Sequence, residues 1–167
     1  MTADPFEYDV AISFASEDRA VAEEVADLLV QKNIRVFRDE YRSADAGLWG
    51  KDMVDHLVNI YARKSRYCVM LISQNYPLKS WTKAERTSAH ERALRDPEEY
   101  ILPVQLDDRE VPGIMQAKGF RDLRQHSIES IVTFLEERLR HTKVRSGPPS
   151  ASHDLRSGNV PSENSQS

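Results

Sequence analysis

Short apolar runs alternate with helical apolar stripes along most of the chain, and this alternation limits the fold more than any other feature of the sequence. The runs are too short to be buried helices, and their nearly continuous apolar character is typical of strands covered on both faces. Strands separated by helices form a parallel sheet with helices on both sides. We therefore expect an α/β fold. The expected strands cover residues 8–14, 34–37, 66–72, 100–106 and 119–123.

Helical patterns fill the intervals between these strands. Ser16 can cap the first helix and Ser127 the last, because a serine hydroxyl accepts a hydrogen bond from a free backbone N–H at a helix start. Pro103 is unusual inside a strand because proline cannot donate to the ladder, so this strand is expected to be bulged or to lie near an edge. The other expected helices cover residues 53–61, about residues 80–95 and, with a weak pattern, residues 111–118.

One domain of ordinary size is expected at residues 7–143. Residues 144–167 are rich in Ser, Gly, Pro and Asn and are expected to form a disordered tail. The formal net charge is −4 without a basic tract, which argues against nucleic acid as a partner. The apolar run at 67–72 is far too short to span a bilayer, and the acidic N-terminus lacks the regions of a signal peptide.

The chain has a single cysteine, Cys68, inside an apolar run, where a small buried hydrophobe is the simplest interpretation. The five histidines show no metal-binding spacing, so no metal site is expected. These features fit a protein of the reducing cytoplasm that contacts neither a membrane nor nucleic acid.

A ligand site is expected beyond the carboxyl ends of the strands, where open parallel sheets bind ligands. Loops at residues 15–16, 38–50 and 73–79 should meet at that edge. Several common chemistries are excluded there. No G-x-G-x-x-G follows the first strand and no P-loop is present. Ile72 is followed by Ser-Gln-Asn, where a receiver domain would need a phosphate-accepting aspartate.

Four segments resemble, in their order and spacing, the Toll/interleukin-1-receptor (TIR) domain family. They are residues 8–18 (YDVAISFASED), 36–40 (VFRDE), 72–76 (ISQNY) and 100–104 (YILPV). The first resembles the family's opening strand, and the second resembles the start of its long BB loop. The third, followed by Trp81 and Glu85, resembles the segment that carries the catalytic glutamate of enzymatic members. The resemblance covers about residues 8–140 and implies the TIR fold, a flavodoxin-like three-layer sandwich with a five-stranded parallel sheet.

The resemblance also implies an activity. Some TIR domains cleave NAD at the bond between nicotinamide and ribose, with NAD as the substrate and no cofactor. Glu85 is then the candidate catalytic residue, because one carboxylate can stabilise the oxocarbenium-like ribose. Trp81, four residues earlier, would share its helix face and shape the pocket. The candidate substrate-binding residues are Phe14, Ser16, Asp39, Trp49 and Trp81.

Each candidate also has a plainer interpretation, which stays open. Glu85 could lie on a solvated helix face, and Trp81 could be core packing. Trp49 could contact a ligand, a neighbouring protomer or its own domain. The remaining candidates could be a strand end (Phe14), a helix cap (Ser16) and the first residue of a loop (Asp39).

Two classes of function are compatible with the resemblance. The first is an NAD glycohydrolase or cyclase in immune or anti-phage signalling, and the presence of Glu85 favours it because adaptors commonly lack this glutamate. The second is a non-catalytic adaptor that binds other TIR domains. A secreted effector that acts on host TIR signalling or host NAD is a further alternative. Self-association through the Arg38–Gly50 loop is expected for the enzyme, with other TIR domains or a downstream effector as further partners.

Overall fold

The structure of the protein is a computed structural model. It describes residues 3–41, 55, 57–78, 80–115, 117 and 119–145, and for residues 39–41, 57, 60 and 143–145 it describes the backbone alone.

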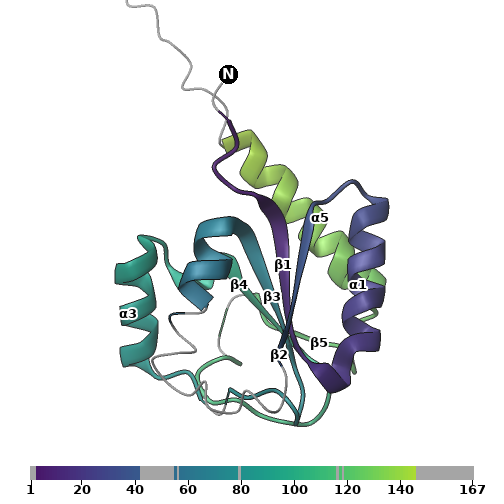
Figure 1. Ribbon diagram of the computed structural model, residues 1–167. Coiled ribbons are helices and arrows are strands. Elements are labelled where there is room, and N and C mark those ends of the chain that lie inside the picture. Colours follow the sequence, from purple (N-terminus) through teal and green to yellow (C-terminus); the bar gives the residue numbers. More distant parts are fainter. Residues whose placement is uncertain are drawn as a thin grey trace, which may run out of the picture.

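One sheet of five parallel strands forms the centre of the molecule, in the order β2-β1-β3-β4-β5 (Figure 1). The strands are β1 (Tyr8–Ala15), β2 (Val36–Tyr41), β3 (Ser65–Ile72), β4 (Ile101–Gln105) and β5 (Arg121–Asp122). This is the flavodoxin-like strand order, with the switch in strand order beside β1. The predicted α/β fold class is confirmed.

Helices cover both faces of this sheet (Figure 1). On one face α1 packs against α5, and on the other α3 packs against η3. A short 3-10 turn, η1, follows β1, and a single helical turn, α4, leads into β4. The bounds are η1 (Ser16–Asp18), α1 (Arg19–Gln31), the π-helix η3 (Leu57–Ala62), α3 (Lys83–Ala93), α4 (Pro97–Tyr100) and α5 (Ile128–Arg145).

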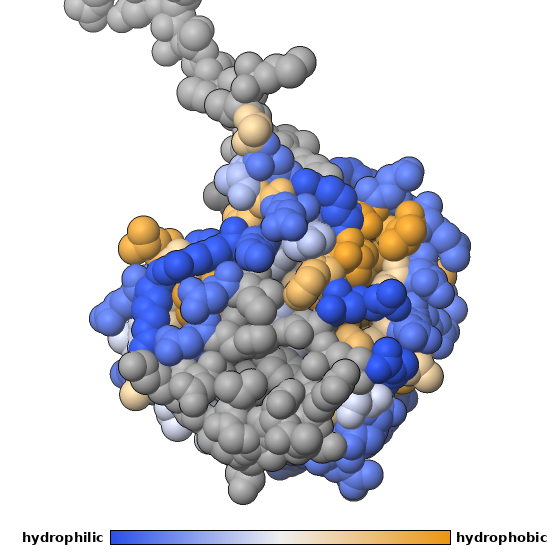
Figure 2. Space-filling model, in the orientation of Figure 1, coloured by the Kyte–Doolittle hydropathy of each residue, from blue (hydrophilic) through white to orange (hydrophobic). Residues whose placement is uncertain are grey.

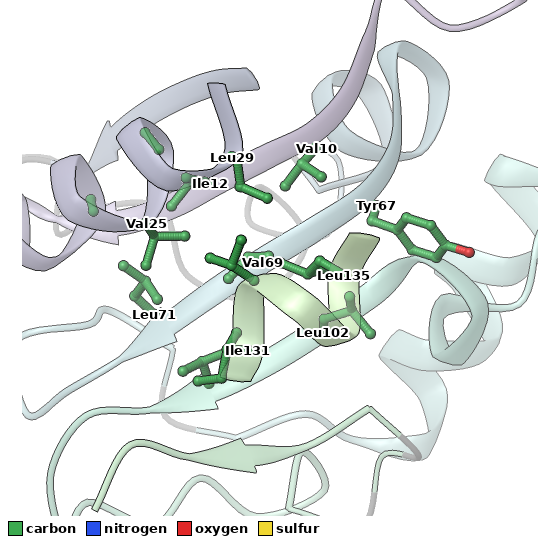
Figure 3. Packing of buried hydrophobic residues seen from close by; sticks show 14 of the residues in the cluster. Val10, Ile12, Val25, Leu29, Tyr67, Val69, Leu71, Leu102, Ile131 and Leu135 are labelled. Atoms are coloured by element: carbon green, nitrogen blue, oxygen red, sulfur yellow. The ribbon is translucent and has the colours of Figure 1, made fainter. Parts of the chain in front are cut away.

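The two faces of the sheet bury separate apolar clusters because side chains alternate along each strand. In β3, the odd-numbered side chains from Tyr67 to Leu71 join the cluster under α1 and α5. The even-numbered ones from Cys68 to Ile72 join the cluster on the α3 face. Figure 3 shows the first cluster, where side chains of three strands meet those of α1 and α5. This arrangement explains why the central strands read as continuous apolar runs.

The second strand differs most from its predicted position. It was expected at residues 34–37 with a loop from Arg38, whereas β2 continues to Tyr41. Arg38 to Tyr41 pair with Ile12 to Ala15 of β1, so backbone hydrogen bonding extends the strand although its side chains are polar. Polar side chains are tolerated here because β2 is an edge strand. The rest of the predicted loop, residues 42–50, lies outside the described residues.

The two predicted serine caps have opposite outcomes. Ser127 does cap α5, since its hydroxyl accepts a hydrogen bond from Ser130 N at 3.2 Å. The prediction for Ser16 is wrong: it begins the η1 turn, and its hydroxyl donates to Glu17 Oε2 at 3.2 Å. The preceding strand runs directly into a 3-10 turn, so α1 begins only at Arg19.

The weak helix predicted at 111–118 is also wrong, because residues 112–115 form a turn. Gly113 has a φ of +87°, a conformation that favours glycine, and a Cβ there would lie 2.1 Å from the carbonyl oxygen of Trp81.

The proline of β4 is explained by the short neighbouring strand: β5 pairs only with Val104 and Gln105, so Pro103 has no partner on that side.

The C-terminal helix extends past the predicted domain boundary at residue 143, because α5 continues through Val144 and Arg145. The remainder of the predicted tail lies outside the described residues. Cys68 is fully buried in the apolar cluster on the α3 face, as expected for a small hydrophobe.

Candidate active site

Three segments meet at the carboxyl edge of the sheet, at the ends of β1, β3 and β4. The hydroxyl of Ser73, just after β3, donates to Asp18 Oδ2 at 2.5 Å. The backbone N–H of Gln74 donates to Asp107 Oδ2, which follows β4, at 2.8 Å. The predicted convergence of the loops after the first and third strands is therefore confirmed.

Arg109 holds the segment after β3 in place. Its guanidinium donates to the backbone carbonyls of Ser73 at 3.0 Å and Leu78 at 2.6 Å, and also to that of Tyr76. Gln105 Nε2 in turn donates to the carbonyl of Arg109 at 2.8 Å. Charged donors form strong hydrogen bonds with carbonyl oxygens, so one side chain fixes the path of the chain toward α3. No motif in the sequence marks Arg109 for this role.

Trp81 lies just before α3 and packs in the apolar core on that face, with 5% of its surface exposed. Its backbone N–H donates to the carbonyl of Pro112 at 2.8 Å. A small cavity, with room for about one water molecule, lies beside it, and Met70, Ile101 and Arg86 are among its lining residues. Because α3 begins at Lys83, Trp81 does not share a helix face with Glu85, and that prediction is wrong.

Glu85 is fixed at the N-terminus of α3 by a capping box with Thr82. Its Oε2 accepts a hydrogen bond from the backbone N–H of Thr82 at 2.8 Å and another from the Thr82 hydroxyl at 2.8 Å. The Thr82 hydroxyl oxygen accepts from the Glu85 N–H at 3.2 Å. Glu85 is half-buried, and its carboxylate lies at the positive end of the helix dipole. The chemistry of this position is therefore that of an oriented anion near the surface.

The surface around this helix is polar. Most residues of α3 are exposed or half-buried, and Ala89 is its only fully buried residue. The outer side of α3, at the left of Figure 2, is largely hydrophilic. Such a surface suits the approach of a charged, hydrophilic ligand better than the docking of an apolar one.

The other predicted substrate-binding residues are not all brought to this helix. Phe14 points into the cluster under α1 and α5, on the opposite face of the sheet from α3. Ser16 is half-buried at the start of η1. Asp39 lies in β2, paired with Ser13, and its side chain is not described. Trp49 lies outside the described residues. A role in substrate binding stays a prediction for all of these residues.

Burial raises the pKa of Asp18, the hydrogen bond from Ser73 lowers it, and the charges of Asp107 and Glu17 raise it further, with a net upward shift. A carboxyl whose pKa is raised on folding holds its proton more tightly in the native state. At a pH above the pKa of Asp18 in the folded protein, the ionised carboxylate therefore destabilises the fold. At a pH below the ordinary aspartate pKa, Asp18 is protonated in both states and this effect vanishes.

Asp18→Asn is expected to increase the free energy of unfolding at neutral pH. Asparagine keeps an oxygen acceptor for Ser73 and removes the charge. The gain should stay below about 1 kcal/mol because Asp18 is only half-buried, so solvent still screens its charge. Denaturant titrations of both proteins at about pH 7 and about pH 3 measure the effect, and the difference should shrink at the lower pH. A variant less stable than the wild type at neutral pH would contradict this reading.

In the part of the chain that the structure describes, no group of three or more histidine, cysteine, aspartate or glutamate side chains could hold a metal ion. None of the helices there combines the length and apolar character needed to cross a bilayer.

Comparisons with known proteins agree on one family. A family profile described as TIR domain matches residues 10–138. The 3′ cyclic ADP-D-ribose synthase AaTIR of Aquimarina amphilecti is 42% identical over 135 residues, which cover 81% of this chain and 41% of that protein. The NAD(+) hydrolase TcpC of Escherichia coli is 30% identical over 98 residues, covering 58% of this chain and 30% of that protein. The chain thus spans less than half the length of these relatives.

Among solved structures, the TIR domain of a Toll-related receptor from Hydra magnipapillata is similar at 17% identity and a TM-score of 0.49. The match covers 80% of this chain and 98% of the receptor domain.

Proposed function

This chain belongs to the TIR domain family, and we propose that it cleaves NAD at the bond between nicotinamide and ribose. The observation that carries the proposal is the oriented carboxylate of Glu85 at the start of α3. The names of two relatives, a cyclic ADP-ribose synthase and an NAD hydrolase, support the choice of substrate. NAD is proposed as the substrate, with no separate cofactor.

The chemistry asks little of the protein. When the bond from ribose C1′ to the nicotinamide nitrogen breaks, its electron pair stays on that nitrogen and neutralises the pyridinium, so no general acid is needed. The ribose is left as a cationic, oxocarbenium-like species, which Glu85 stabilises by its negative charge. Water then adds to C1′ and loses a proton, giving ADP-ribose. Alternatively an internal hydroxyl adds to C1′ and loses its proton, giving a cyclic product. A glycoside hydrolase needs a second carboxylate because its leaving group must be protonated.

The experiment that tests this function also separates the two products. The purified protein is incubated with NAD in heavy-oxygen water, and the products are resolved by chromatography and mass spectrometry. Hydrolysis would place one heavy oxygen in each ADP-ribose, whereas cyclisation would place none and would give a product lighter by one water than ADP-ribose. We expect nicotinamide in equal amount to the NAD lost. Intact NAD would count against the function as a whole.

We propose that the enzyme works in the cytoplasm, in immune or anti-phage signalling, and that it acts as an assembly of several copies. Uncontrolled loss of NAD would harm the cell that makes the enzyme, and assembly offers a means of control. Residues 38–50, of which 38–41 belong to β2, carry charges of both signs together with Trp49, a combination suited to steering and anchoring an interface. Other TIR domains or a downstream effector are further candidate partners.

If assembly controls the activity, the initial rate per molecule should rise with enzyme concentration. Trp49→Ala should weaken assembly and activity together, because aromatic anchors contribute much of the binding energy at interfaces. Initial rates measured across a wide range of enzyme concentration, alongside light scattering, test this. A rate strictly proportional to enzyme concentration would rule out control by assembly.

A further inference from the structure

Thr82 contacts the candidate catalytic carboxylate through both of its donors. Its hydroxyl and its backbone N–H each donate to Oε2 of Glu85 at 2.8 Å. Both donors therefore hold the same oxygen. Within the described residues no hydrogen bond or ion pair involves Oε1, so one oxygen of the carboxylate is held by Thr82 and the other makes no such contact there.

The two contacts restrict the side chain of Glu85. A glutamate on a helix surface normally samples several rotamers, and a carboxylate that must face a developing cation works best when it is oriented in advance. The Thr82 hydroxyl has a double role, since it donates to Oε2 and accepts from the Glu85 N–H at 3.2 Å. The capping box at the start of α3 therefore also orients Glu85, the third residue of the helix.

We propose that Thr82 is a positioning residue for NAD cleavage: it orients the Glu85 carboxylate so that Oε1 faces the ribose. This inference rests on the proposed function. Thr82 acts through Glu85 rather than on the substrate, so its loss should lower kcat and leave KM nearly unchanged.

Two substitutions separate this role from helix capping. Thr82→Ser keeps both the donor and the cap. Thr82→Asp keeps the cap, because aspartate is at least as good as threonine at the N-cap and favours the positive helix end. However, ionised aspartate cannot donate a hydrogen bond to Glu85, and its charge repels the carboxylate.

We expect Thr82→Ser to retain kcat close to that of the wild type. Thr82→Asp should lower kcat at least about tenfold, with an unfolding temperature close to that of the wild type. Thr87→Asp provides a matched control: it adds the same charge to the same exposed helix, where the Thr87 hydroxyl donates to the carbonyl of Lys83 at 3.0 Å. This control should retain the wild-type rate.

The outcomes distinguish the two proposals. If the wild type cleaves NAD and Thr82→Asp does so at the same kcat, the positioning role is wrong while the function stands. The positioning role is also wrong if Thr82→Asp and Thr87→Asp lose activity equally, because charge alone would then account for the loss. A wild type that never cleaves NAD, at any enzyme concentration, overturns both proposals.

Discussion

Glu85→Gln is expected to slow NAD cleavage by about 10²-fold or more while leaving the fold intact, because the substitution removes the charge that stabilises the cationic ribose. Glutamine can replace glutamate in a capping box, so its side-chain oxygen can still accept from the Thr82 N–H. The loss should therefore fall on kcat rather than on stability. Initial rates of nicotinamide release, with thermal unfolding of each protein, measure both quantities.

A matched control is available on the same helix. Glu91 is exposed and lies six residues after Glu85, so Glu91→Gln changes the net charge equally without touching the candidate site. It should retain the wild-type rate. If Glu85→Gln turned NAD over as fast as Glu91→Gln, Glu85 would not be the catalytic residue.

Asp9→Ala is expected to lower the free energy of unfolding by about 3–5 kcal/mol, the range for breaking a buried ion pair. Asp9 is 1% exposed, and its carboxylate accepts from Arg35 N at 2.9 Å and from Arg35 Nη2 at 3.0 Å. Arg66, also buried, has its Nε 3.8 Å from the same carboxylate. Removing Asp9 would leave Arg66 in a poorly solvated place with only Asp4 as a charged partner among the described residues.

Asp4→Asn serves as the comparison for this prediction. Asp4 contacts the same two arginines, but its side chain is 30% exposed, so solvent can replace much of what it provides. Its loss should destabilise the protein clearly less than loss of Asp9. Denaturant titration of the three proteins gives the free energies. Equal effects of the two substitutions would show that burial of Asp9 is not what matters.

The strands that are buried on both faces could be predicted from the sequence, because their burial shows directly as continuous apolar residues. β1 and β3 lie within one residue of their expected bounds at each end. The end of β2 could not be predicted, because the second half of the strand is polar. Its pairing with β1 depends on backbone hydrogen bonds, which the residue types do not reveal. The turn at 112–115 was missed since its shape depends on contact with Trp81, which is distant in the chain.

The candidate site was accessible from the sequence only in part. Resemblance pointed to Glu85, but the placement of Trp81 on the same helix face failed because it assumed a helix starting near residue 80. The pattern of threonine followed three residues later by glutamate is a readable capping signal, and it marks both the start of α3 and the orientation of Glu85. Arg109 could not have been found, because its contacts with the loop after β3 exist only in the folded chain.

NAD cleavage is tested most directly by measuring, with chromatography, how much nicotinamide the purified wild-type protein releases from NAD. The measurement is repeated over a range that reaches high enzyme concentration. We expect one nicotinamide for each NAD consumed, together with linear or cyclic ADP-ribose, and loss of this activity in Glu85→Gln. NAD that remains intact with the folded wild-type protein at every concentration would contradict this expectation.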